Sequence, residues 1–416
     1  MEQLPVSVVV VSRGRPDSLR LCLTGLARLH HRNYEIVVVA DPQGIAVAQA
    51  LPFAGHLRLI PYDIPNISAA RNQGLSAAAG EIIAFIDDDA VPEPAWLAHL
   101  EVAFRDSQVA AAGGFVIGRN GISFQWKARS FGSDGQAVPL QVDDDLPTVL
   151  SPAQGQAIKT EGTNMAVRRW VLKKLGGFDE SFRFYMDETD LNMRLAIGGY
   201  STAIVPRALV HHAYAPSPRR QQNRAVLNLQ EVGRSSALFW RKYAPETDWP
   251  RLRARLTTEQ RRRVMSQMRD GLLEPGAARQ ALNTLSDGLT EGFNADFAPV
   301  AQIARRWGDI LSFPSLATKD PVVLQAGLFG RRAVLARAKA LAAKGHTVSV
   351  YFLSKTAVFH TMVFSQDGYW LQKGGVYGKS DRSGPLLRLT SHDRRRKAEQ
   401  DRVEQSRHFR PFFKQP

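Results

Sequence analysis

The chain has 416 residues, which is too long for one ordinary domain and predicts two or three structural units. A hydrophobic content of 44% excludes global disorder, and the single cysteine, Cys22, excludes a disulfide framework and a cysteine-based zinc site. The formal net charge of +15 predicts an anionic partner. The N-terminus lacks a basic start and a cleavage site, and no stretch approaches the roughly 18 apolar residues of a membrane span. We therefore expect a cytoplasmic protein.

In the first third of the chain, short apolar runs alternate with amphipathic segments. Strands are expected at residues 6–11, 35–40, 57–62 and 82–86, and helices at residues 16–29 and 68–79. Continuous apolar runs such as IIAFI at 82–86 are typical of a largely parallel sheet that is covered on both faces. Ligands of such open α/β sheets bind beyond the carboxyl ends of the strands.

The pattern changes twice farther along the chain. Residues 119–160 are rich in glycine, serine and proline and predict loops with a small sheet, whereas residues 223–311 look mostly helical. A strand–helix–strand pattern returns at residues 322–353, which predicts a small α/β unit near the C-terminus.

Three consecutive acids, Asp87, Asp88 and Asp89, directly follow the apolar run at 82–86. At the end of a buried strand they repel one another and lose hydration, unless a cation neutralises them. Mg²⁺ and Mn²⁺ bind carboxylate oxygens together with substrate phosphates. Alternate residues of an extended turn point the same way, so we expect Asp87 and Asp89 to share a metal and Asp88 to be structural. A helix cap is the simpler interpretation, but capping needs one acid and not three.

A second triplet, Asp143, Asp144 and Asp145, has the same composition in a different context. It follows no buried strand and precedes Pro147 in a loop-like stretch. We interpret it as a solvated loop.

A further acidic group, Asp187, Glu188 and Asp190, begins a helical pattern that Gly198-Gly199 ends. The acids occupy the first helical turn, where backbone N–H groups and the helix dipole favour negative charge. Two interpretations stay open. The acids form an N-cap arrangement, or one carboxylate takes a proton from an acceptor hydroxyl.

A histidine pair, His211 and His212, follows the strand-like run YSTAIVPRALV. Each can be an ordinary surface or core residue, or a metal ligand. In an extended chain the two side chains point to opposite sides, so only one is expected to coordinate the metal.

Two basic clusters stand out. Residues Arg219 to Arg263 contain twelve Arg and Lys against four Asp and Glu, and Arg394 to Lys397 form the second cluster. A solvated helix surface is one explanation, and an anionic partner is the other: nucleic acid, lipid headgroups or a phosphorylated substrate, among which charge alone cannot choose. We expect loose attachment to the anionic inner face of the cell membrane. No nucleic-acid partner is expected, because no recognition motif is present.

Taken in order, these segments resemble glycosyltransferase family 2, an inverting family with the nucleotide-sugar-binding GT-A fold. The resemblance covers residues 4–245 and is carried by VSVVVVSRGRP, ISAARNQGLSAAAGEIIAFIDDDAVPEPAWL, EGTNMAVRRWVLKKLGGFDESF, YMDETDLNMRL and ALVHH. It implies an α/β fold with a Rossmann-like mixed sheet at residues 1–245. A helical region at 246–318 and a small α/β accessory domain with a basic tail at 319–416 would follow.

The resemblance also implies roles for individual residues. Glu188 would be the base, with Asp187 as its rival, because the motif reads Asp-Glu where Glu-Asp is commoner, and Asp190 would complete the catalytic group. Asp87, Asp89 and His211 would hold the divalent metal, Mn²⁺ or Mg²⁺. Gly162 and Asn164 would line the acceptor side. Contacts to the nucleotide sugar would come from Ser12, Arg13, Asp41 at the nucleobase, Arg71, Asn72, Asp87 and Asp88.

The implied function is transfer of a hexose from a nucleotide diphosphate, expected to be UDP, to a hydroxyl of a glycan or lipid-linked acceptor. The product would be a cell-surface polysaccharide or glycolipid. Two other classes of protein remain. A nucleotidyltransferase would use the same acidic metal site, but would release pyrophosphate. A non-catalytic basic scaffold would bind nucleic acid or a membrane and would need no acid triplet.

Overall fold

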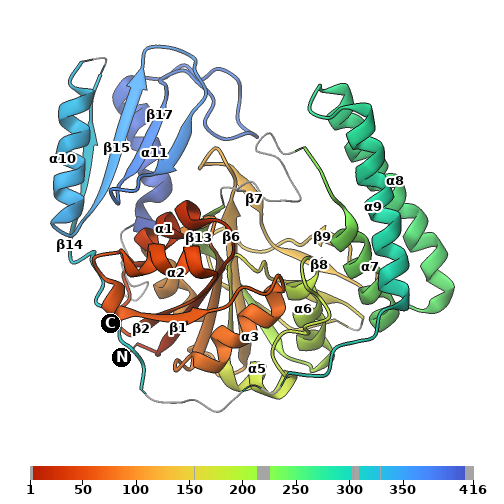
Figure 1. Ribbon diagram of the computed structural model, residues 1–416. Coiled ribbons are helices and arrows are strands. Elements are labelled where there is room, and N and C mark those ends of the chain that lie inside the picture. Colours follow the sequence, from red (N-terminus) through yellow and green to blue (C-terminus); the bar gives the residue numbers. More distant parts are fainter. Residues whose placement is uncertain are drawn as a thin grey trace.

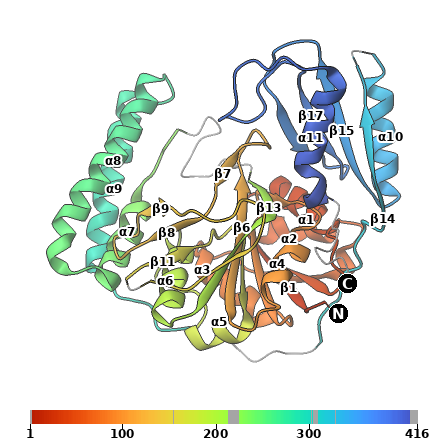
Figure 2. The ribbon, with the colours of Figure 1, turned by 180° about the vertical axis from the view of Figure 1, so that it is seen from behind.

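The structure is a computed structural model that describes residues 3–153, 155–212, 225–301, 303, 309–327 and 329–407. Figures 1 and 2 show a large sheet domain, a helical hairpin on one flank, and a small sheet domain on the other. This arrangement confirms the α/β class followed by a helical region and a small C-terminal sheet. Within the described residues, none of the helices combines the length and the apolar character that a membrane span requires.

The large domain is built on a mixed sheet with the strand order β10-β13-β6-β12-β4-β1-β2-β3, and β5 and β7 pair with β13 and β6. β1 is parallel to β2 and β4, as expected, whereas β12 is antiparallel to its neighbours β4 and β6. The strands are β1 (Val6–Ser12), β2 (Tyr34–Ala40), β3 (Leu57–Pro61), β4 (Ile82–Asp87), β5 (Ala90–Pro92), β6 (Val109–Ile117), β7 (Phe124–Trp126), β10 (Thr148–Leu150), β12 (Met165–Arg168) and β13 (Ser201–His212).

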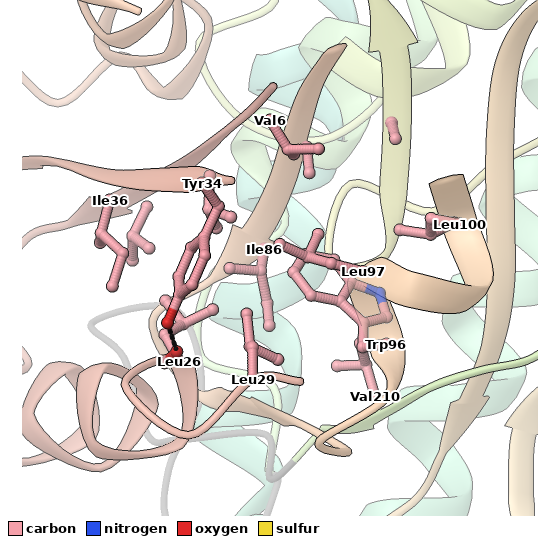
Figure 3. Packing of buried hydrophobic residues seen from close by; sticks show 14 of the residues in the cluster. Val6, Leu26, Leu29, Tyr34, Ile36, Ile86, Trp96, Leu97, Leu100 and Val210 are labelled. Carbon is pink, nitrogen blue, oxygen red and sulfur yellow. Dashed lines mark hydrogen bonds between the residues drawn. The ribbon is translucent and has the colours of Figure 1, made fainter. Parts of the chain in front are cut away.

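Helices cover both faces of this sheet, and each face has its own core. Alternate side chains of β1 supply them: Val8 faces the first core and Val9 the second, as the strand period of two requires. Figure 3 shows the first core, where the Tyr34 hydroxyl donates to the Leu26 carbonyl at 2.9 Å. The first face carries α1 (Pro16–Leu26), α2 (Pro42–Gln49) and α4 (Trp96–Ala103), and the second α3 (Ile67–Ala77), α5 (Arg169–Leu175) and α6 (Asp187–Ile197).

The strand register brings several strand ends together. Val11 near the end of β1 lies opposite Asp87 of β4, and His212 at the end of β13 lies opposite Ala90 of β5. Between these ends and the helical hairpin lies a small sheet of β8 (Arg129–Phe131), β9 (Ala137–Pro139) and β11 (Ala157–Lys159). It belongs to the stretch predicted as loops and a small sheet.

The helical region consists of α7 (Gln230–Tyr243), the short η2 (Glu246–Asp248), and a hairpin of α8 (Trp249–Arg269) and α9 (Pro275–Asn294). α7 packs closely on α9 because glycines face the partner backbone. A Cβ at Gly288 would lie 2.0 Å from the Gln230 carbonyl oxygen. The following segment returns to the large domain, where Phe313 packs against Tyr34 and Phe53.

The small C-terminal domain contains β14 (Lys319–Gln325), α10 (Arg331–Ala343), β15 (His346–Ser354), β16 (Thr361–Phe364), β17 (Trp370–Gly375) and α11 (His392–Arg407). β14, β15 and β17 are parallel, and β16 is antiparallel to β17. The domain is fixed to the large domain by Arg407, which is fully buried and donates two 2.9 Å hydrogen bonds to Glu93. Burial raises the pKa of Glu93, but Arg407 and His211 outweigh it and lower this pKa to about 2.

Candidate active site

The acid triplet at the end of β4 divides its side chains between two sides. Asp87 and Asp89 line a cavity of about 730 Å³. Asp88 is fully buried, accepts a 2.7 Å hydrogen bond from the Ser12 hydroxyl and pairs with Arg15 at 2.5 Å. Burial raises the pKa of Asp88 to about 7, although the charge of Arg15 opposes it. Asp88 therefore anchors the turn after β1, and it does not face the cavity.

His212 joins Asp87 and Asp89. One potential ligand atom from each of the three lies within 4.8 Å of the others, and His212 Nε2 is 3.3 Å from Asp89 Oδ1. Two carboxylates and one imidazole are suitable donors for a divalent ion such as Mn²⁺ or Mg²⁺. This donor set fits the metal that the sequence predicts.

His211, the histidine that the sequence analysis selected, lies on the other side of β13. Its Nε2 is 2.8 Å from Glu93 Oε1, and its ring centroid is 4.5 Å from that of Trp370 in the small domain. Contrary to that expectation, His212 and not His211 lies beside Asp87 and Asp89. The alternation of side chains was anticipated, but the register of β13 against β5 decides which histidine faces the acids.

Arg71 on α3 connects the metal-binding acids with the acidic helix. Its Nη2 lies 3.1 Å from Asp87 Oδ1, and its Nη1 pairs with Asp187. Nη2 also donates to the Gly162 carbonyl at 3.4 Å, and a Cβ at Gly162 would lie 2.7 Å from the same atom. Arg71 and Gly162 therefore hold the two acidic groups in place.

The acidic residues of α6 have three different environments. The helix follows two non-glycine residues with positive φ, Tyr185 (70°) and Met186 (66°), a conformation that is costly and clusters at functional sites. Glu188 lines the cavity and lies 2.7 Å from Lys159 Nζ. Asp187 is turned to Arg71. Asp190 is fully buried and accepts hydrogen bonds from Arg194, Lys242 and Tyr243, each at 2.7 Å.

These environments separate the pKa values of the two candidate bases. Burial raises the pKa of Glu188, but Lys159 outweighs it and brings this pKa to about 2. Burial raises the pKa of Asp187, and the neighbouring Glu188 charge raises it further, against the charge of Arg71. At neutral pH the carboxyl group that faces the cavity is therefore ionised.

The other predicted residues lie around the cavity and not on its wall. Both carboxylate oxygens of Asp41 accept backbone hydrogen bonds, from Gly14 and Gly44 at 2.8 and 2.9 Å. Arg13 is exposed and pairs with Asp63. The buried Asn72 and Asn164 connect backbone segments of the large domain. These residues support the folded shape of the site.

Several wall residues were missed by the sequence analysis. The position of Arg15 directly after the first predicted strand could have suggested a place near the site. In the structure it pairs with both Asp88 and Asp89. Lys159 and Trp126 come from the loop-like stretch, and Glu259 and Arg263 come from α8. No motif marks these four, since their position depends on how distant elements pack.

Comparisons with known proteins agree with this geometry. A family model described as "Glycosyltransferase like family 2" matches residues 4–230. The O-antigen biosynthesis protein RfbC of Myxococcus xanthus is 26% identical over 233 residues, which are 50% of this chain and 17% of that protein. A pre-mycofactocin glycosyltransferase of Mycobacterium tuberculosis is 28% identical over 215 residues, 50% of this chain and 42% of that protein. The chain thus spans less than half the length of these two relatives.

The succinoglycan biosynthesis protein ExoM of Rhizobium meliloti is 27% identical over 338 residues, 79% of this chain and 91% of that protein. Among solved structures, a crystal structure of GalNAc-T7 with UDP, GalNAc and Mn²⁺ aligns with a TM-score of 0.41 and 17% identity. That alignment covers 51% of this chain and 44% of the other. Because the family model matches more than half of the chain, the protein belongs to glycosyltransferase family 2, and its large domain has the GT-A fold.

Proposed function

We propose that the protein is a metal-dependent inverting glycosyltransferase. It moves a hexose from a uridine diphosphate donor to a hydroxyl of a glycan or lipid-linked acceptor, on the cytoplasmic side of the membrane. The relatives named for O-antigen and succinoglycan biosynthesis support a polysaccharide or glycolipid as the product.

One observation carries this proposal. A single cavity of about 730 Å³ contains the Asp87, Asp89 and His212 group together with the Glu188 carboxylate. A site that holds a donor diphosphate through a metal, and an acceptor hydroxyl beside a base, needs these two features in one space.

Asp87, Asp89 and His212 would hold the metal. When bound, a divalent ion supplies Lewis-acid neutralisation of the negative charge on the departing diphosphate. Because one donor is an imidazole, we propose that Mn²⁺ is preferred over Mg²⁺, which favours oxygen ligands.

Glu188 would take the proton of the acceptor hydroxyl. The hydroxyl oxygen would attack the anomeric carbon from the face opposite the diphosphate. This single displacement inverts the anomeric configuration. Lys159 keeps Glu188 ionised before the acceptor arrives, and the aromatic side chains of Trp126 and Tyr185 line the same cavity. Arg71 keeps the two acidic groups at a fixed separation.

The test uses the full chain with UDP-hexoses and a set of polysaccharide-precursor acceptors, with and without added Mn²⁺. We expect metal-dependent release of UDP, with no pyrophosphate. Release of pyrophosphate would instead identify the nucleotidyltransferase alternative, and the absence of any metal-dependent donor binding would contradict the proposal.

A further inference from the structure

The small C-terminal domain collects three loops at one edge. Because β14, β15 and β17 are parallel, their carboxyl ends lie at the same edge of the sheet. The chain leaves this edge after Gln325, Ser354 and Gly375. We call the described residues of the three loops that follow, 326–327 with 329–330, 355–360 and 376–391, the docking edge.

The docking edge exposes large apolar side chains that pack into no core. Phe329 and Leu389 are more than 90% exposed, and the other four are at least 58% exposed. The domain core is supplied separately, by residues such as Leu324 and Val350. Large apolar side chains that are exposed together at one edge of a sheet mark an interaction site. The six side chains are Phe329, Val358, Phe359, Leu386, Leu387 and Leu389.

Backbone hydrogen bonds hold the second and third loops together. The His360 N–H of the second loop donates to the Lys379 carbonyl of the third at 2.8 Å, and within the third loop Leu387 forms a β-bridge with Gly378. The apolar side chains of these loops are therefore presented by a defined backbone.

Exposed basic residues flank the apolar ones along the chain. Arg332, Lys355 and Arg388 are exposed at this edge, whereas the neighbouring acids are Asp381 and Asp393. Apolar side chains flanked by Lys and Arg suit the interface of an anionic bilayer, where the former enter the headgroup boundary and the latter meet lipid phosphates. A protein partner would not require this combination.

The position of the docking edge relates it to the active site. The Met362 N–H donates to the Asn120 carbonyl at 2.8 Å, and the Arg382 N–H donates to the Ser123 hydroxyl at 2.9 Å. The first contact comes from β16, next to the docking edge, and the second from the docking edge itself. Both are made with the turn before β7, whose Trp126 lines the cavity. In both views the edge rises on the same side of the large domain as the tip between α8 and α9, with β7 between them (Figures 1 and 2).

We propose that the docking edge binds the surface of an anionic lipid bilayer and thereby brings the cavity to membrane-bound acceptors. This assigns the contact to a different surface from the two basic clusters of the sequence. In the second cluster Arg395 is buried and paired with Glu399, so that cluster is not a continuous basic surface. In the first cluster, residues 219–224 lie outside the described part of the chain.

The experiment measures cosedimentation of the full chain with vesicles of phosphatidylcholine alone or mixed with phosphatidylglycerol, without donor or metal. We expect binding to the mixed vesicles that weakens with salt, since each cation near the surface contributes about fivefold in affinity. The L387S/L389S and K355E/R388E variants should each lose at least about tenfold. The matched variant R261E/R262E, on the exposed face of α8, should bind as the unchanged protein does.

A second readout uses a fluorophore on an introduced cysteine. The natural cysteine, Cys22, is buried and will not react with the label. A polarity-sensitive fluorophore on Leu389→Cys should shift to shorter wavelength with the mixed vesicles, whereas the same label on Ile197→Cys, 70% exposed on the large domain, should not. Failure of the protein to bind mixed vesicles at low salt would overturn the proposal. Loss of binding in R261E/R262E, with binding retained in L387S/L389S and K355E/R388E, would also overturn it. Sugar transfer to a soluble acceptor is measured separately with L387S/L389S. Transfer that continues in this variant shows that the proposed reaction holds whether or not the docking edge binds vesicles.

Discussion

The two aspartate triplets, at residues 87–89 and 143–145, have the same composition and opposite surroundings. Asp88 is fully buried, and burial raises its pKa to about 7. Asp143 is fully exposed, and the backbone N–H groups of Leu146 and Asp145 lower its pKa. In the second triplet Asp144 pairs with the exposed Lys127 at 2.7 Å, as expected for a solvated loop.

The strand that precedes a run of acids therefore decides whether the acids meet in a site. Asp87 and Asp89, at the end of β4, line a cavity, and His212 of β13 lies beside them. The second triplet has no such strand, so water and nearby cations satisfy its charges. Substitution of Asp89 tests this contrast directly, and substitutions of Glu188, His212 and Lys159 test the cavity to which β4 contributes.

The largest effect is expected from Asp89→Asn. Metal-assisted charge stabilisation contributes several kcal/mol to a transition state, so loss of this ligand should lower metal-dependent turnover by about 10³-fold. Asp144→Asn is the matched control and should retain both turnover and Mn²⁺-dependent donor binding, measured by titration calorimetry. Equal losses in both variants would show that strand context does not distinguish the triplets.

The second-largest effect on turnover is expected at Glu188, in the acidic group at the start of α6. Glu188→Gln keeps the shape of the side chain but cannot accept a proton, so kcat should fall by about 10² to 10³-fold while donor Kd changes little. Steady-state kinetics and donor titration measure the two quantities. If Asp187→Asn abolishes turnover and Glu188→Gln retains it, the two roles must be exchanged.

The third effect separates the two histidines. His212→Asn should weaken Mn²⁺ binding by at least about 10- to 100-fold, as replacement of groups around metal sites commonly does. His211→Asn removes the contact with Glu93 and Trp370, so it should lower the melting temperature and leave Mn²⁺ affinity near that of the unchanged protein. The opposite result would restore His211 as the ligand.

The smallest effect is a shift of pH dependence. Lys159 lowers the pKa of Glu188, and the base is active when deprotonated, so Lys159→Met should raise that pKa. The acidic limb of the kcat profile should move to higher pH by about 1 to 3 pH units, with the plateau at high pH less affected. A limb that stays in place would mean that the group titrating in this profile is not Glu188.

Prediction from sequence succeeded where local pattern determines structure. The apolar runs predict β1 to β4, and the first-turn acids and Gly198-Gly199 predict α6, because periodicity and capping are local properties. It failed where packing decides. The choice between His211 and His212 depends on strand register, and Lys159 reaches Glu188 only because β11 packs beside α6.

The same limit applies to the polar residues that the resemblance assigns to the donor or the acceptor and that do not line this cavity. From the sequence, a buried Asn164 that donates to the Phe115 and Ala208 carbonyls and accepts from the Trp96 indole cannot be told from one that contacts a ligand, since both are polar residues near a motif. Burial and the identity of the hydrogen-bond partner separate the two, and both are tertiary properties.

The buried Glu93–Arg407 pair also bears on the order in which the protein is completed during synthesis. The two residues are 314 positions apart, so at about 5 to 20 residues per second Glu93 emerges roughly 15 to 60 s before its guanidinium partner. Until Trp370 and Arg407 have been synthesised, His211 and Glu93 lack the ring and the guanidinium that they contact. The end of β13, which carries His211 and His212, therefore gains these contacts only when β17 and α11 have packed against the large domain.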